Sequence, residues 1–134
     1  MALLRAREAA MARFRPMLRS HGLTEQQWRV IRVLADSDDI DASELARRSF
    51  LLAPSLTRIL QYLEGEKLVR RRGDDQDQRR SVFSLTSSGR RLFAAVAPDS
   101  EALYRDIEAE FGGKRLERLY QLLAAFTDEL QEES

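Results

Sequence analysis

Two helix-start signals in close succession are the feature of this sequence that most restricts its fold. Thr24 can cap a first helix, and Gln27 stands three residues later, where its side chain can bond back to the cap. Asp41 and Glu44 repeat the pattern, and an apolar residue before each cap can pack on one inside each helix. The signals predict two separate helices, the second of which is short and ends by Ser49.

A tight connection and a third helix follow the second signal. We expect Pro54 at the first helical position, with Ala53 as a cap that has no side-chain acceptor and leaves helical N–H groups free for a phosphate. The apolar residues that recur on one face are Leu56, Ile59, Leu60 and Leu63. The polar residues of other faces are Ser55, Thr57, Arg58, Gln61 and Tyr62. Two short helices joined by a tight turn are typical of a helix-turn-helix.

The segment RRRGDDQDQRRSVFSL, residues 70–85, predicts a β-hairpin. Two short strand candidates, KLVRRR and SVFSL, flank GDDQDQRR, which has turn-forming residues and almost nothing to bury. Arginines at the tip of such a ribbon can follow phosphates and enter a minor groove. We expect Asp77 to hold the guanidinium of Arg79 in one orientation, while Asp74 and Asp75 stabilise the turn.

Long helical patterns flank this central region. Apolar spacing predicts a helix over residues 3–18, which Pro16 kinks or closes. A second long helix follows a cap at Thr86 and is interrupted at Pro98. The last helix, after residues 112–113, carries more apolar surface than one small neighbour would cover. This excess predicts a homodimer in which the outer helices of two chains intertwine.

Charge is distributed unevenly, although the formal net charge is zero. Residues 42–91 hold 11 basic and 6 acidic residues, a net charge of +5, whereas residues 92–134 hold 4 and 10, a net charge of −6. An anionic partner such as a phosphate backbone would be attracted to the middle of the chain alone. We interpret the acidic C-terminal third as a solvated helix face and not as a catalytic carboxylate pair.

The residue inventory bears on chemistry and location. Without cysteine and with His21 as the one histidine, the chain has little material for disulfides, zinc fingers or serine–histidine triads. We therefore expect no enzyme, no cofactor and no metal. No apolar run approaches the roughly 20 residues of a membrane span, and arginines interrupt the N-terminal apolar residues too often for a secretory signal. We expect a cytoplasmic protein without a membrane partner.

A second candidate site lies around the break between the first two helices. The residues that combine aromatic, cationic and titratable side chains there are Phe14, Arg15, Met17, His21 and Trp28. They predict a pocket for a small aromatic acid, and the alternative is that the tryptophan and histidine are satisfied core residues. The candidate DNA-binding residues have alternatives too. In this alternative the polar face of the helix that follows Pro54 is only solvated. The ion pairs of the hairpin are then surface salt bridges that contribute under ~1 kcal/mol to stability.

Three stretches resemble the MarR family of winged helix-turn-helix regulators: LTEQQWRVIRVL, ELARRSFLLAPSLTRILQYLEGEKLVRR and DQRRSVFSLTSSG. The most specific part is Asp77 with Arg79, followed by Leu85–Thr86 and Gly89, and the similarity covers nearly the whole chain. The resemblance implies a mainly α fold with a small β-hairpin wing and N- and C-terminal dimerisation helices.

The resemblance also implies a domain organisation. A single domain would span residues 1–134, with the DNA-binding lobe at residues 24–91. Residues 1–23 and 92–134 would form the dimerisation helices.

The function that the resemblance implies is repression of an aromatic-acid catabolic operon by a homodimer bound to double-stranded operator DNA. Ser55, Thr57 and Arg58 would meet the major groove and Arg79 the minor groove. The full set of expected DNA-binding residues is Ser55, Thr57, Arg58, Gln61, Arg72, Asp77, Arg79 and Arg80. A phenolic or aromatic carboxylate would release the DNA. A regulator with another effector or none, and a protein–protein adaptor, are the alternatives.

Overall fold

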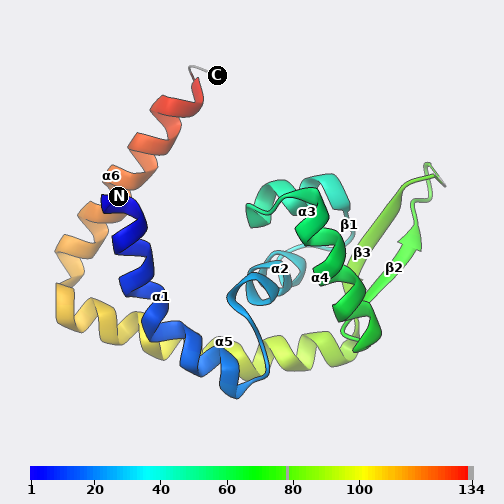
Figure 1. The fold of residues 1–134 in the computed structure, drawn as a ribbon, viewed down its shortest axis with the longest axis horizontal. Helices are drawn as coiled ribbons and strands as arrows, with labels where there is room; N and C mark the ends of the chain where they lie inside the picture. Colours follow the sequence, from blue (N-terminus) through cyan, green and yellow to red (C-terminus); the bar gives the residue numbers. More distant parts are fainter. Residues whose placement is uncertain (78, 133–134) are drawn as a thin grey trace. The chain divides into compact units, whose positions relative to one another are not determined.

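The computed structural model describes residues 1–77 and 79–132, and the chain divides into two compact units, Met1–Asp99 and Ser100–Ser134. The first unit contains α1 (Ala2–Ser20), α2 (Glu25–Ala35), β1 (Ile40–Asp41), α3 (Ala42–Ser49), α4 (Ala53–Gly65), β2 (Val69–Gly73), β3 (Ser81–Leu85) and the first half of α5 (Ser87–Phe111) (Figure 1). The second unit holds the rest of α5 and α6 (Gly113–Glu132). The expected mainly helical fold with a hairpin wing is confirmed, whereas the domain bounds stay a prediction.

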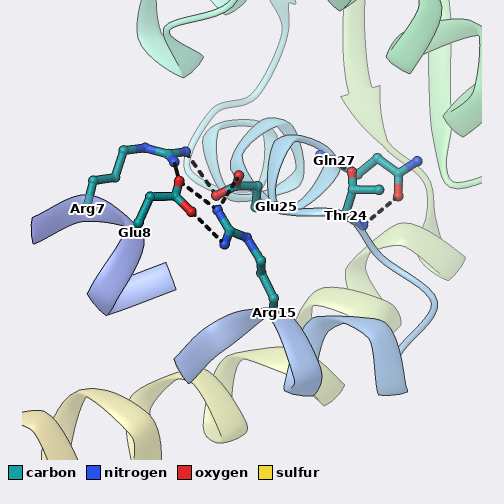
Figure 2. Close-up of polar contacts among 6 residues, drawn as sticks. All are labelled: Arg7, Glu8, Arg15, Thr24, Glu25 and Gln27. Atoms are coloured by element: carbon teal, nitrogen blue, oxygen red, sulfur yellow. Dashed lines mark hydrogen bonds and ion pairs between the residues drawn. The ribbon is translucent and has the colours of Figure 1, made fainter. Parts of the chain in front are cut away.

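The two helix-start signals fold largely as predicted. At α2 the capping box is complete: the Gln27 N–H donates to Thr24 Oγ1 at 3.1 Å, and the Thr24 N–H donates to Gln27 Oε1 at 3.0 Å (Figure 2). At α3 the Glu44 N–H donates to Asp41 Oδ1 at 2.8 Å. The Glu44 carboxylate accepts from Arg47 instead of bonding back to the cap. An ion partner on the same helix has therefore displaced half of the second capping box.

The hairpin is part of a sheet with a third strand that the sequence did not predict. β2 and β3 pair antiparallel, and β1 pairs with the other edge of β3, which gives the order β1-β3-β2. β3 is thus the central strand, and all four residues from Val82 to Leu85 are buried. Burial on both faces is typical of a central strand, which can be covered from both sides. In Figure 1 the β2–β3 ribbon extends beyond the helices beside it.

The core of the first unit lies where α2, α3 and α4 meet the sheet. The predicted inward stripe of α4 is confirmed, with Leu56, Leu60 and Leu63 buried and Ile59 partly buried against them. Removing such side chains from water supplies about 25 cal/mol per Å² of apolar area, the main favourable contribution to folding. The same packing leaves the opposite face of α4 exposed.

The predicted closure of a helix at Pro16 and the interruption at Pro98 do not occur, whereas the alternative of a kink at Pro16 stays a prediction. α1 continues through Pro16 to Ser20, and α5 continues through Pro98 to Phe111. Both prolines are exposed, so water can bond to the backbone carbonyl that each proline leaves without its helical donor. No helix within residues 1–77 and 79–132 is long and apolar enough to cross a membrane.

Candidate nucleic-acid interface

The start of α4 differs by one residue from the prediction. Ala53 is the first helical residue, so Leu52 is the N-cap and Pro54 occupies the second helical position. Proline is tolerated at either position because the first helical N–H groups have no partner inside the helix. Leu52 makes no side-chain capping bond. The availability of these N–H groups to a phosphate stays a prediction.

The outer face of α4 presents hydrogen-bonding side chains to solvent. Thr57, Arg58 and Gln61 are exposed, and Ser55 is half-buried. The Thr57 hydroxyl donates to the Ala53 carbonyl at 2.9 Å, so its oxygen can still accept. Arg58 has no hydrogen bond or ion pair with any residue that the structure describes. Its planar fork of donors is therefore free to bind a base edge or a phosphate.

The tip of the wing holds an oriented arginine. Asp77 Oδ1 accepts from the Arg79 backbone N–H at 3.0 Å and from Arg79 Nε at 3.2 Å. The predicted pairing is thus confirmed. The Arg79 side chain is 92% exposed, and its terminal Nη groups have no partner among the described residues. Asp77 therefore orients the guanidinium through Nε and leaves both Nη groups open to a ligand.

One of the two predicted turn aspartates bonds to the backbone. Asp74 Oδ1 accepts from the Gln76 N–H at 3.0 Å, as expected for an aspartate at a turn. Asp75 instead forms an ion pair with Arg72, with 3.3 Å between Oδ1 and Nη1. The tip conformation therefore depends on an ion pair as well as on turn geometry.

Arg72 and Arg80, both expected to bind DNA, are paired with carboxylates next to β1. Arg72 binds Asp39, and Arg80 binds Asp41 and lies 3.8 Å from the Asp74 carboxylate. The hydrogen bond to Asp39 raises the pKa of Arg72 above its ordinary value. These pairs link Arg72 in β2 and Arg80, just before β3, to the carboxylates of residues 39 and 41 ahead of α3. Contact of either with DNA stays a prediction.

Most of the residues predicted to bind a small molecule are packed or paired within the protein, and their contact with a ligand stays a prediction. Phe14 and Trp28 are buried, and Met17 packs against the core. Trp28 stacks on Phe93 of α5, with ring centroids 5.5 Å apart. His21 Nε2 lies 2.8 Å from Asp99 Oδ2.

The fifth residue of that set, Arg15, belongs to an ion network between α1 and the start of α2 (Figure 2). It binds Glu8 at 2.9 Å and Glu25 at 3.3 Å, and Arg7 binds the same two carboxylates at 3.1 and 2.9 Å. Arg15 also lines a cavity of about 230 Å³ beside Leu18, and none of the other four predicted residues is among the described residues that line it. The structure therefore does not gather the predicted set around this cavity.

The network predicts a pH dependence of stability. The hydrogen bond from Arg15 holds the pKa of Glu8 below its ordinary value. A carboxylate whose pKa falls on folding stabilises the native state above its unfolded-state pKa of about 4.3. The contribution is lost as the pH falls through the lower folded-state value. Urea unfolding should show the wild type more stable than Glu8→Gln at pH 6, with the difference shrinking below about pH 4. An unchanged difference down to pH 2.5 would contradict this role of Glu8.

A model of the MarR family matches residues 21–80 of the chain. The homoprotocatechuate degradative operon repressor of Escherichia coli is 46% identical over 125 residues, which cover 93% of this chain and 84% of that protein. The solved structure of NadR in complex with 4-hydroxyphenylacetate has a TM-score of 0.89 and 35% identity, and the match covers 99% of this chain and 97% of NadR. The repressor CouR, solved with a 23-mer DNA duplex, has a TM-score of 0.87 and 25% identity, with 94% and 89% covered.

Proposed function

The chain belongs to the MarR family, and we propose that it is a homodimeric transcriptional repressor that binds operator DNA through α4 and the wing. The single observation that carries this proposal is the oriented and exposed guanidinium of Arg79 at the wing tip. CouR, similar over most of the chain, is solved on a DNA duplex. A repressor acts by occupying DNA, so we assign no catalytic activity and place the protein in the cytoplasm with its operator.

The contacts divide by groove. Ser55, Thr57, Arg58 and Gln61 form the set that we assign to the major groove. Arginine can bind guanine bidentately and glutamine can bind adenine there, while hydroxyls reach bases or phosphates. Arg79 enters the minor groove, where narrow A·T tracts concentrate negative potential. Arg72 and Arg80 lie behind the tip of the wing. We assign phosphate contacts to them, which each would make while still paired with its carboxylate.

The homodimer is supported by the apolar surface of α6. Its exposed large apolar residues are Leu119, Tyr120, Leu122, Leu123, Phe126 and Leu130. A monomer rarely leaves so much contiguous apolar surface in water, and a second copy would bury it. A two-fold dimer would present two α4 helices to half-sites of a palindromic operator. Sedimentation equilibrium should give twice the chain mass of 15.4 kDa, and a monomer at DNA-binding concentrations would contradict the dimer.

The relatives support a phenolic aryl acid as the effector. The similar repressor of Escherichia coli controls homoprotocatechuate degradation, and homoprotocatechuate is 3,4-dihydroxyphenylacetate. NadR is solved with 4-hydroxyphenylacetate, which shares the ring and the acetate group. We therefore propose that this protein represses an aromatic-acid catabolic operon and releases its operator when such an acid binds.

A titration of the operator complex tests this proposal. The operator is first selected from a random duplex library, and its affinity is then measured by fluorescence anisotropy with either acid present. A ligand that favours a different distance between the DNA-binding lobes of the two protomers should weaken operator binding by about 5- to 150-fold at saturation. The matched amide, 4-hydroxyphenylacetamide, should have no effect because it lacks the charge. Operator affinity unchanged by either acid would remove the sensor function and leave the DNA-binding function standing.

A further inference from the structure

A cleft of about 610 Å³ lies at the C-terminal end of α3, within the first unit of the chain. Arg29 lines it from α2, Arg48 and Phe50 from the end of α3, and Phe93 from α5. Its volume lies in the range of about 300–1,000 Å³ that small-molecule sites occupy. None of the ligand residues predicted from the sequence lines it. The cleft is therefore a separate candidate site.

The cleft has more hydrogen-bond donors than acceptors. Its described lining residues include three arginines, Arg29, Arg32 and Arg48, but a single carboxylate, that of Asp36. Arg48 Nη2 is 3.7 Å from that carboxylate, and Arg48 Nη1 donates to Ser37 Oγ at 2.9 Å. Arg29 Nε is buried and has no hydrogen-bond partner among the residues that the structure describes. Buried donors in native proteins nearly always have a partner. The excess of arginine donors over carboxylates, together with this unpaired Nε, favours an anionic ligand.

Two aromatic rings give the cleft its apolar walls. The Phe50 side chain is 79% exposed, and its backbone has φ 56°, a left-handed conformation that is uncommon for a non-glycine residue. Phe93 is partly buried and stacks on Trp28, with 5.5 Å between the ring centroids. Flat rings bind other flat rings by offset stacking or edge contacts. An aromatic ligand would cover apolar surface that water now contacts at Phe50.

We propose that this cleft binds a small aromatic carboxylate, whose carboxylate pairs with Arg29 and Arg48 and whose ring packs between Phe50 and Phe93. The inference rests on the proposed function, because it gives the effector a binding site. Phe50 ends α3 and stands three residues before Ala53, the first residue of α4. A ligand held against Phe50 therefore touches the turn that leads into α4, the helix that we assign to the major groove.

Trp28 provides the measurement, since it is the one tryptophan of the chain and stacks directly on Phe93. Its fluorescence is titrated with phenylacetate and with the uncharged phenylacetamide, and calorimetry gives an independent dissociation constant. We expect phenylacetate to bind and phenylacetamide not to bind. Arg29→Gln and Arg48→Gln should each raise the dissociation constant at least about tenfold, the effect of losing a charge-assisted hydrogen bond. Arg91→Gln, an exposed arginine of α5 outside the cleft, is the matched control and should bind like the wild type.

Three results would overturn the site: phenylacetate fails to bind, Arg29→Gln and Arg48→Gln bind it like the wild type, or phenylacetamide binds as tightly as the acid. Sulfate that competes at equal concentration would overturn the aromatic part. Far-UV circular dichroism confirms that each variant is folded. Phe50→Ala, on the exposed wall, gives a second reading that a folding defect at Arg48 would not disturb, and it should weaken acid binding while leaving DNA binding intact.

Operator binding, measured on the same samples, separates this inference from the proposed function. A variant that binds operator DNA like the wild type but no longer responds to acid supports both. If acid still releases the operator from Arg29→Gln and Arg48→Gln, the effector site lies elsewhere and the repressor function stands. If the wild type binds acid through Arg29 but binds no DNA duplex, the cleft stands and the repressor function falls.

Discussion

Replacing Gly89 by alanine is expected to lower the free energy of unfolding by about 3 kcal/mol or more. A Cβ at this position in α5 would lie 2.2 Å from the backbone oxygen of Leu68 and 3.0 Å from Cδ2 of Leu85. That oxygen cannot move freely, because it accepts the Thr86 N–H at 3.0 Å. The substitution should therefore force α5 away from the wing strands, although alanine normally stabilises a helix relative to glycine.

Urea unfolding of Gly89→Ala and Gly65→Ala makes the comparison quantitative. Gly65 ends α4, and a Cβ added there would meet nothing within 4 Å. Gly65→Ala should change the free energy of unfolding by less than about 1 kcal/mol. Equal stability of the two variants would show that the close approach of α5 to Leu68 is not tight. The same contact gives a physical reason for Gly89 at the end of the sequence pattern that begins at Asp77.

Replacing Arg58 by alanine should remove about 1–3 kcal/mol of discrimination at one base pair in each half-site, about 5- to 150-fold in relative affinity. Arg58 is exposed and pairs with no described residue, so its guanidinium is available to bind a base. The alanine variant lacks this group. Affinities for the operator and for each single-base variant give the preference at every position. Arg47→Ala, on the exposed side of α3 and paired with Glu44, is the matched control. An Arg58→Ala preference profile identical to that of the wild type would contradict the base contact.

Local signals carried most of the fold. The capping box of Thr24 and Gln27 and the α4 stripe were predictable because their partners lie within four residues of one another. β1 was not, since two residues give no period and their pairing with β3 joins segments about forty positions apart. Whether Pro16 closes α1 or lies within it could not be decided from the sequence, since that depends on the surroundings of the proline in the fold.

The site divides in the same way. Arg79 and Asp77 are two residues apart, so their pairing was predictable. Arg72 and Arg80 were assigned to DNA without their partners, because Asp39 and Asp41 reach the wing only through β1. The arginine cleft collects residues from three helices and has no local pattern. The one signal for it was Phe50, a large apolar residue where glycine or asparagine commonly ends a helix.

The placement of the wing tip on DNA is tested most directly by the salt dependence of operator binding in the wild type and in Arg79→Ala. Each cation that neutralises a phosphate releases counterions, so the logarithm of the association constant should fall linearly with the logarithm of salt concentration. Arg79→Ala should bind more weakly at low salt and reduce the slope by about 1 per chain, or about 2 per dimer. Asp77→Ala should keep a slope close to that of the wild type but weaken binding, since the charge of Arg79 remains while the acceptor that orients it is lost. An Arg79→Ala variant with the affinity and slope of the wild type would contradict the placement of the wing tip on DNA.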